Sequence, residues 1–334
     1  MSTNLNAQFT DLSAATQFYS GGIEIDMFQT EITDLVRRAG VLGQRIQYVP
    51  ATGSISNFFE QTTISEGQFS DPRNIAATST IPTRVQKSVM VKAITNRVDY
   101  GLFEMETVGQ QGVFAQLKAK DLSDMVQGML RLRDKGLWTG TDVVAGAQTG
   151  NGTTTQYVGL LKQITKSATI AKDASIVDGL RTEVAKLMAD PNFELRPTAI
   201  YINPLALDYL EQEVKNSNNA VKFVSTDMAT VGAGISVAGL QTAAGLLPII
   251  PEPFLPVDAS INGVAAAGAG LHNYPFAIVT EDLIEFHYVG SKAPRVFQLG
   301  TQANLQENYV GVMFGAPVAK AASQAHVVGA IVRA

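Results

Sequence analysis

The sequence contains no cysteine and only three histidines, His272, His287 and His326, among its 334 residues. The absence of cysteine excludes a disulfide framework, a thiolate nucleophile, an iron–sulfur cluster and cysteine-based zinc sites. No histidine lies within four residues of another, so a pair of metal ligands on one helical turn is also excluded. We therefore expect this chain to have no cofactor, no metal ligands and no cofactor-binding residues.

Charged residues are scarce as well, at 16% of the chain, against the ~25% that is usual in soluble domains. The net charge is −5, and residues 176–300 carry thirteen acidic and seven basic residues. No segment has the dense lysine and arginine stripe of a dedicated nucleic-acid reader. A low charge fraction leaves few groups to hydrate an isolated surface, which favours large interfaces between copies.

Long uninterrupted apolar runs are also absent. The longest apolar stretches, such as 244–256, are broken by glycine and proline, which argues against a membrane-spanning segment. The first residues lack the basic start and the apolar run of a signal peptide. The length predicts two to three domain-sized units.

Residues 45–100 are rich in Ser, Thr, Gly, Gln, Val and Ile, which is typical of extended structure. The stretches 46–63 and 78–97 flank a turn-rich centre from Glu66 to Arg73, and this pattern predicts a long hairpin. Arms of about 15–18 residues would reach roughly 50–60 Å. Because a two-stranded ribbon is only marginally stable in water, we expect another subunit to support it.

The rest of the chain predicts helices and further strands. A broad apolar stripe over 104–138 predicts a helix of roughly 48 Å that ends near a buried Trp138, and a glycine-rich loop follows it. Residues 174–300 are typical of an α/β unit, and the tail from 308 onward of a strand that returns to the first half of the chain. Within the α/β unit we expect helices at 176–188 and 205–214, the second capped by Asn203 and Pro204, and strands at 198–202, 246–250, 276–279 and 283–289.

Two short motifs could suggest catalysis, but each has a more ordinary explanation. The segment 234–239 around Ser236 departs from a nucleophile elbow because its second glycine comes one position too late. Glu104 and Glu106 lie where a helix is expected to start, and the helix dipole favours acidic residues there.

The best acid–histidine cluster is Glu285 with His287, next to Glu281 and Asp282. On a strand, Glu285 and His287 share a face, and we interpret them as a surface salt pair. These candidates do not form a convergent reactive set. We therefore expect no catalytic residues, and a protein that is not an enzyme.

The predicted hairpin tip carries candidate contact residues. Asp71 and Arg73, on either side of Pro72, could form a charged latch that docks into a partner or an ordinary turn, and chemistry alone leaves both open. Aromatic side chains on a projecting loop need a dry surface, which favours docking. The candidate intersubunit contacts are Phe58, Phe59, Phe69, Asp71 and Arg73.

The order of these features resembles the major capsid protein of tailed bacteriophages, which has the Hong Kong 97-like fold. The segment 89–106 is similar to that family's strand leading into its spine helix, and 201–209 to the strand–helix step of its axial domain. Residues 248–253 and 305–312 are similar to its late core strands. The shared order covers roughly residues 20–332.

The resemblance implies an α+β fold with an N-terminal arm, an extended β-hairpin loop, a peripheral domain with a long spine helix, and an α/β axial domain. It places the N-terminal arm at 1–44 and the extended loop at 45–85. The peripheral domain would comprise 86–165 and 301–334, with the spine helix at about 104–138, and the axial domain 170–300.

The function implied is that of a major capsid protein that assembles into hexamers and pentamers of an icosahedral phage head around double-stranded DNA. Its expected partners are further copies of itself, a separate scaffolding protein, a portal, an optional decoration protein, and packaged DNA bound non-specifically, with no membrane. It would reside in the virion, and in the host cytoplasm during assembly. We assign no intersubunit crosslink. The alternatives are an encapsulin-like compartment shell and, from another class, an α/β hydrolase-type enzyme.

Overall fold

The computed structural model describes residues 40–73, 75, 79–103, 106, 117–140, 148–149, 156–216, 239–301 and 306–334. The helix expected in the N-terminal arm, Ser236, Glu104 and most of the glycine-rich loop lie outside these residues. The same is true of most of the first part of the helix expected at 104–138.

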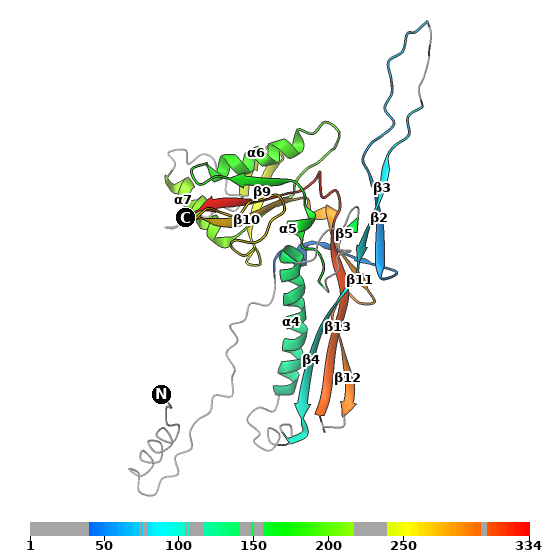
Figure 1. Ribbon diagram of the computed structural model, residues 1–334, viewed down its shortest axis with the longest axis vertical. Helices are drawn as coiled ribbons and strands as arrows, with labels where there is room; N and C mark the ends of the chain where they lie inside the picture. The colour runs from blue at the N-terminus through cyan, green and yellow to red at the C-terminus, as the bar shows by residue number, and fades with distance from the viewer. Residues whose placement is uncertain are drawn as a thin grey trace.

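An elongated sheet backed by one long helix forms what we call the peripheral half. Its strands run in the order β1-β11-β13-β12, and β4 pairs with the other edge of β13. The bounds are β1 Gln47–Pro50, β4 Lys92–Gly101, β11 Ile284–Val289, β12 Arg295–Thr301 and β13 Gln306–Ala319, with helix α4 at Leu117–Thr139. Helix α4 lies along β4 and β13 (Figure 1). A Cβ atom at Gly311 would come 2.6 Å from the Sδ of Met129, so this glycine permits the close approach of the helix.

A second sheet with two helices forms the axial half. Its order is β6-β14-β10-β7-β9-β8. The bounds are β6 Ser167–Ile170, β7 Ala199–Ile202, β8 Gly239–Thr242, β9 Gly245–Pro251, β10 His272–Val279 and β14 Val327–Arg333, with α6 at Ile176–Met188 and α7 at Pro204–Asn216. Helix α6 has the predicted bounds, and the Ser175 side chain caps it by accepting a hydrogen bond from the Asp178 N–H. The predicted cap of α7 is confirmed, because the Asn203 Oδ1 accepts from the Leu205 N–H at 2.9 Å.

Two hydrophobic cores follow from this arrangement. One core lies between the six-stranded sheet and helices α6 and α7, and includes Leu180, Leu210 and Phe276. The other joins the two halves, since it contains Met129 of α4 together with Tyr201 of β7. Trp138 is fully buried there, as predicted, with its ring centroid 5.4 Å from that of Tyr201. No described helix is long and apolar enough to cross a membrane.

The hairpin differs from the prediction in where its strands pair. Only β2 (Ile55–Gln61) and β3 (Arg84–Met90) pair with each other, and the short β5 (Gln148–Thr149) adds to β3. The start of the first predicted arm becomes β1, which runs parallel to β11, and the end of the second becomes β4, which pairs with β13. Both arms therefore change partners at the hairpin base.

The strands also join the two sheets differently from the predicted domain boundary at residue 300. Strands β11 and β12, which the sequence places in the axial domain, pair with β13 in the peripheral sheet. Conversely, β14 from the predicted peripheral tail pairs with β10 and β6 in the axial sheet. The chain therefore passes between the two halves more often than the predicted ranges 86–165, 170–300 and 301–334 imply.

Candidate interaction surfaces

The hairpin projects away from both halves (Figure 1). Beyond Gln61 and Arg84, residues 62–70 and 79–83 belong to no described strand. The Thr62 N–H donates to the Thr83 carbonyl at 3.0 Å, and the hydroxyl oxygens of Ser65 and Thr80 lie 2.7 Å apart. Most of the backbone in this outer part lacks the regular ladder of a paired strand, so it is open to pairing with other chains.

The hairpin also exposes large apolar side chains, both in strand β2 and beyond it. Phe59 is 71% exposed and Phe69 is fully exposed. Three isoleucines on the same projection are largely exposed as well: Ile64, Ile75 and Ile81. Exposed apolar groups at this density on a projection mark an interaction surface.

Phe58 departs from the prediction that it contacts another subunit. It is only 7% exposed and packs edge-on against His287 of its own chain, with ring centroids 6.5 Å apart. Successive side chains of a strand point to opposite faces, so Phe58 points inward while Phe59 points outward. The two adjacent phenylalanines therefore have different roles.

The tip residues Asp71 and Arg73 form a local turn. The Asp71 Oδ1 accepts a hydrogen bond from the backbone N–H of Arg73 at 2.9 Å, and both residues are exposed. An aspartate that binds the backbone two residues ahead is a common turn device. This hydrogen bond supports the interpretation of the tip as a turn. The docking of Asp71 and Arg73 on a partner stays a prediction.

A buried polar cluster anchors the hairpin base. His287 contacts the Ser56 Oγ through Nδ1 at 2.7 Å and the Glu285 Oε2 through Nε2 at 2.8 Å. The Lys320 Nζ donates to the other oxygen of Glu285 at 2.5 Å. Burial would raise the pKa of Glu285, but the hydrogen bonds from Lys320 and His287 outweigh it and hold the pKa below its ordinary value.

This cluster corrects the expected surface salt pair. His287 is 4% exposed and Glu285 is 7% exposed, because the hairpin base covers this end of β11. Each of the polar side chains in the cluster bonds to another, and together they join strand β2, strand β11 and the turn after β13. Such an arrangement fits anchoring of the hairpin. Ser236, which the enzyme interpretation would add, lies outside the described residues.

A second set of contacts fixes the same base. The Glu60 Oε1 accepts from the Ala321 N–H at 2.7 Å, and its Oε2 lies 2.6 Å from the Lys87 Nζ. Glu60 on β2 and Lys87 on β3 therefore tie both hairpin strands to the turn that also carries Lys320. The inner hairpin is held by contacts with the body of its own chain, whereas the printed contacts of the described outer residues run across the hairpin itself.

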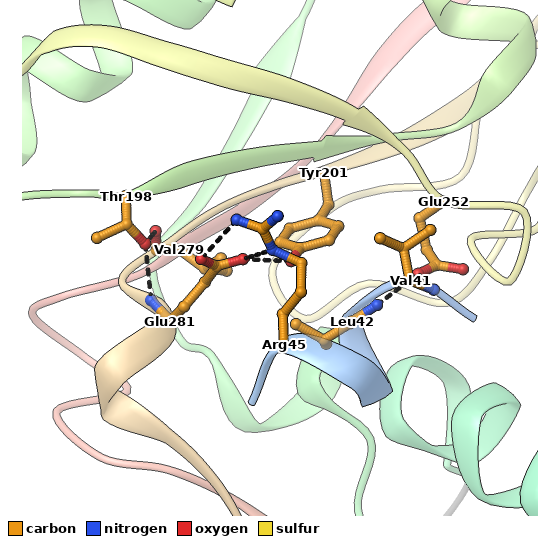
Figure 2. A network of polar contacts seen from close by, with 8 residues as sticks. All are labelled: Val41, Leu42, Arg45, Thr198, Tyr201, Glu252, Val279 and Glu281. Carbon is orange, nitrogen blue, oxygen red and sulfur yellow. Dashed lines mark hydrogen bonds and ion pairs between the residues drawn. The ribbon is translucent and has the colours of Figure 1, made fainter. Parts of the chain in front are cut away.

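Residues 40–50, which we call the clasp, connect the two halves just before the hairpin. On the axial side, the Glu252 Oε2 accepts from the N–H groups of Val41 and Leu42 at 2.9 and 3.1 Å (Figure 2). These two groups lie at the start of helix α2 (Leu42–Arg45). Glu252 is fully buried, and a carboxylate at a helix start is favoured by the helix dipole.

Arg45 extends the clasp to a second carboxylate, that of Glu281 in the 3-10 turn Glu281–Leu283, which joins β10 of the axial sheet to β11 of the peripheral sheet. Its guanidinium forms two hydrogen bonds with Glu281, at 2.5 and 3.0 Å, and the Tyr201 hydroxyl donates to the same carboxylate at 2.5 Å (Figure 2). Burial would raise the pKa of Glu281, but the hydrogen bonds from Arg45 and Tyr201 lower it below its ordinary value. Glu281 therefore has a structural partner set, and among the described residues no group of three acidic or histidine side chains could hold a metal ion.

The peripheral half holds the clasp from the other side. The Asp134 Oδ2 of α4 accepts from the Gly40 N–H at 2.9 Å. A Cβ atom at Gly43 would overlap the Asp134 Oδ1, so a side chain there would displace Asp134. Arg133 pairs with Asp134 at 2.7 Å and also stacks over the ring of Tyr48, 5.5 Å from its centroid.

Sequence reasoning missed a further apolar surface on the peripheral half. Strand β12 exposes Val296, Phe297 and Leu299, and Phe103 just beyond the end of β4 is 81% exposed. The available signal was the apolar run of β12, whose residues a buried strand would also use. Only the structure shows that β12 is the last strand on its side of the sheet.

Comparison with known proteins relates this fold to viral shells. No family model and no curated protein matches the sequence. Among solved structures, the capsid of Myoviridae phage XM1 superposes with a TM-score of 0.63 at 10% identity, over 93% of this chain and 99% of that one. The capsid of a native GTA particle gives a TM-score of 0.60 at 13% identity, over 93% and 95% of the two chains.

An encapsulin shares the same fold. The holo-SrpI encapsulin complex of Synechococcus elongatus PCC 7942 superposes with a TM-score of 0.55 at 12% identity, over 95% of this chain and 94% of that one. These likenesses extend over nearly the whole chain. The α+β fold of tailed-phage capsid proteins, predicted from the order of features, is thereby confirmed for this protein.

Proposed function

We propose that this chain is the major capsid protein of a tailed bacteriophage, and that its copies form the hexamers and pentamers of an icosahedral head around double-stranded DNA. The observation that carries the proposal is a hairpin with exposed apolar side chains that projects away from both halves of a fold shared with phage capsid proteins. Phe59 and Phe69 dock on a neighbouring copy, with Asp71 and Arg73 beside them. Its partners in the virion are further copies of itself, a separate scaffolding protein, a portal and the packaged DNA.

Electron microscopy of the purified full-length chain tests this proposal. We expect closed particles several hundred ångströms across, formed alone or with the scaffolding protein of the same virus. A monodisperse monomer under every assembly condition would contradict the shell function. Particles that lack nucleic acid when isolated from infected cells would contradict the DNA-enclosing role.

An encapsulin-like compartment is the second candidate, because the likeness to an encapsulin covers as much of the chain as the likenesses to phage capsids. The two functions differ in content. Particles purified from their natural source contain double-stranded DNA in the first case and folded cargo protein in the second. Nuclease digestion followed by extraction and mass spectrometry distinguishes them.

A further inference from the structure

A groove of about 700 Å³ lies in the peripheral half, between the start of strand β4 and the C-terminal part of helix α4. Strand β4 pairs with β13 along one edge, and no other described strand pairs with it. Five consecutive residues around the start of β4 line the groove, so the groove follows the second edge of this strand. The lining residues are 91–95, Leu132, Gly136, Gly140, Gln156 and Tyr157.

The lining of the groove is largely apolar and carries a single charge. Val91, Ile94 and Leu132 contribute aliphatic side chains, and Leu132, which is 53% exposed, lies at the mouth. Lys92 is the one charged residue among the described lining residues. The side-chain amide of Gln156 adds hydrogen-bond donors. The described lining therefore combines apolar walls with one positive charge and no negative charge.

The wall formed by Tyr157 is held in place by the rest of the subunit. Its hydroxyl donates to the Arg133 carbonyl at 2.8 Å, and its ring packs edge-on against Phe286, with centroids 6.4 Å apart. A Cβ atom at Gly136 would come 2.6 Å from the Tyr157 hydroxyl oxygen, so this glycine lets the ring lie against α4. The groove is thus formed in advance, as small-molecule sites usually are.

We propose that this groove binds a single-chain amphipathic acid, with its hydrocarbon chain along Ile94 and Leu132 and its carboxylate beside Lys92. The volume lies in the range of about 300–1,000 Å³ that is usual for small-molecule sites. A carboxylate forms a strong, charge-assisted hydrogen bond with an ammonium group, whereas a cationic head group beside Lys92 is repelled. The site lies within one subunit and does not depend on the proposed capsid function.

Titration of the unassembled, full-length chain with dodecanoate below its micelle concentration tests the site. By isothermal titration calorimetry we expect saturable binding of one dodecanoate per chain. Dodecyltrimethylammonium has the same hydrocarbon chain and the opposite charge, and it should bind at least about tenfold more weakly. Equal affinities for the two amphiphiles, or no saturable binding of dodecanoate, would overturn the proposal.

A substitution at the mouth of the groove tests where the hydrocarbon chain lies. Leu132→Glu places a carboxylate there and should abolish the binding of dodecanoate. Leu205→Glu is the matched control, because Leu205 on α7 is 56% exposed and lies outside the lining, and it should bind dodecanoate like the wild type. In methyl nuclear magnetic resonance spectra of the wild type, dodecanoate should shift the signals of Ile94 and Leu132. Wild-type affinity in Leu132→Glu, or an unshifted Ile94 signal, contradicts this site.

A second substitution tests the position of the head group. Lys92→Gln should weaken dodecanoate binding about tenfold and leave the binding of the uncharged dodecanol unchanged. Lys135→Gln is its control, since it removes the same charge from an exposed position on α4 outside the lining. Wild-type affinity for dodecanoate in Lys92→Gln, or equal losses in the two variants, would refute the contact between the carboxylate and Lys92.

A membrane lipid offers the same chemistry as a free acid, so vesicles of phosphatidylglycerol form a further arm of the experiment. Their acyl chains are held in the bilayer, and we expect no vesicle binding that depends on Leu132. Flotation with vesicles that is present in the wild type and lost in Leu132→Glu would overturn the assignment to a free acid.

Discussion

The outer hairpin and the six-stranded axial sheet contain similar apolar and β-branched residues. The sheet buries these side chains, and the hairpin exposes them. In the axial sheet, strand β7 is buried along its whole length and pairs with a neighbour on both sides. In the outer hairpin, Phe69 and Ile81 face solvent and the backbone has few partners. The sheet is therefore complete within one chain, whereas the proposed function has a neighbouring copy cover the exposed side chains of the hairpin.

The largest test of this difference removes the hairpin tip. Deletion of residues 67–73 leaves both cores untouched, and we expect a soluble, folded subunit that forms no shells. Circular dichroism and electron microscopy measure the two properties on the same sample. Gly67→Ala is the control, since no atom lies within 4 Å of a Cβ there, and it should assemble normally. Normal shells from the deletion variant would refute the docking role.

Substitution of one phenylalanine in each region tests the same difference at the level of single residues. Phe276→Ala in β10 empties a fully buried site and is expected to lower the free energy of unfolding by about 3–5 kcal/mol. Phe69→Ala should change that free energy by less than ~0.5 kcal/mol and weaken assembly instead. Urea denaturation of the unassembled subunit measures the first effect and light scattering the second. Equal losses of subunit stability would show that the hairpin also folds against its own chain.

Substitutions of two adjacent residues in β2 test which of its faces packs on the subunit and which is exposed. Phe58→Ala removes a side chain packed on His287 and should cost about 3 kcal/mol of subunit stability. Phe59→Ala, on the opposite face of β2, should cost less than ~0.5 kcal/mol and reduce assembly. The same denaturation and scattering assays apply. A larger stability loss for Phe59 than for Phe58 would invert the assigned faces.

The last effect appears only in acid and concerns a buried histidine in the body of the subunit. His326 is completely buried; its Nδ1 accepts from the Thr280 N–H and its Nε2 donates to the Lys320 carbonyl, so it is neutral. Burial lowers the pKa of His326 to about 4, from an ordinary value of 6.5. Because the unfolded chain binds the proton more readily, subunit stability should fall as the pH drops from 6.5 to 4, by at most about 3 kcal/mol.

The control for this effect is His326→Gln, which keeps one donor and one acceptor but does not titrate. Its free energy of unfolding should lose this part of the pH dependence between pH 6.5 and 4. An identical pH profile for the variant and the wild type would contradict a neutral buried His326.

Local patterns predicted the elements better than their partners. Helix α6 and the Asn203 cap follow from apolar spacing and capping chemistry within a few residues, and the structure has both. The strand pattern over 46–63 could not show that its first part joins β11, because that partner lies more than 230 residues further along the chain. Likewise, the alternation of the sequence placed Glu285 and His287 on one face, but only the fold shows that the hairpin base buries them.

The clasp had no usable sequence signal. Glu252 stands between Pro251 and Pro253 after an apolar strand, where a solvent-exposed turn is the ordinary interpretation. Its burial depends on the arrival of Val41 and Leu42, about 210 residues earlier in the chain. In the same way, the exposed side chains of the outer hairpin were predicted because they depend on no distant partner within the chain.

The pairing of β4 with β13 has a consequence for synthesis of the protein. Residues 92–101 form their ladder with residues 306–315, about 200 positions later, so the peripheral sheet has no central strand until the ribosome has made almost the whole chain. Helix α4 and the base of the hairpin also pack against this sheet, so their packing also requires the synthesis of β13. Closure of such distant pairs is slow, and a prematurely terminated chain lacks the strand altogether. A chain that stops before residue 306 therefore lacks the strand with which β4, β11 and β12 pair.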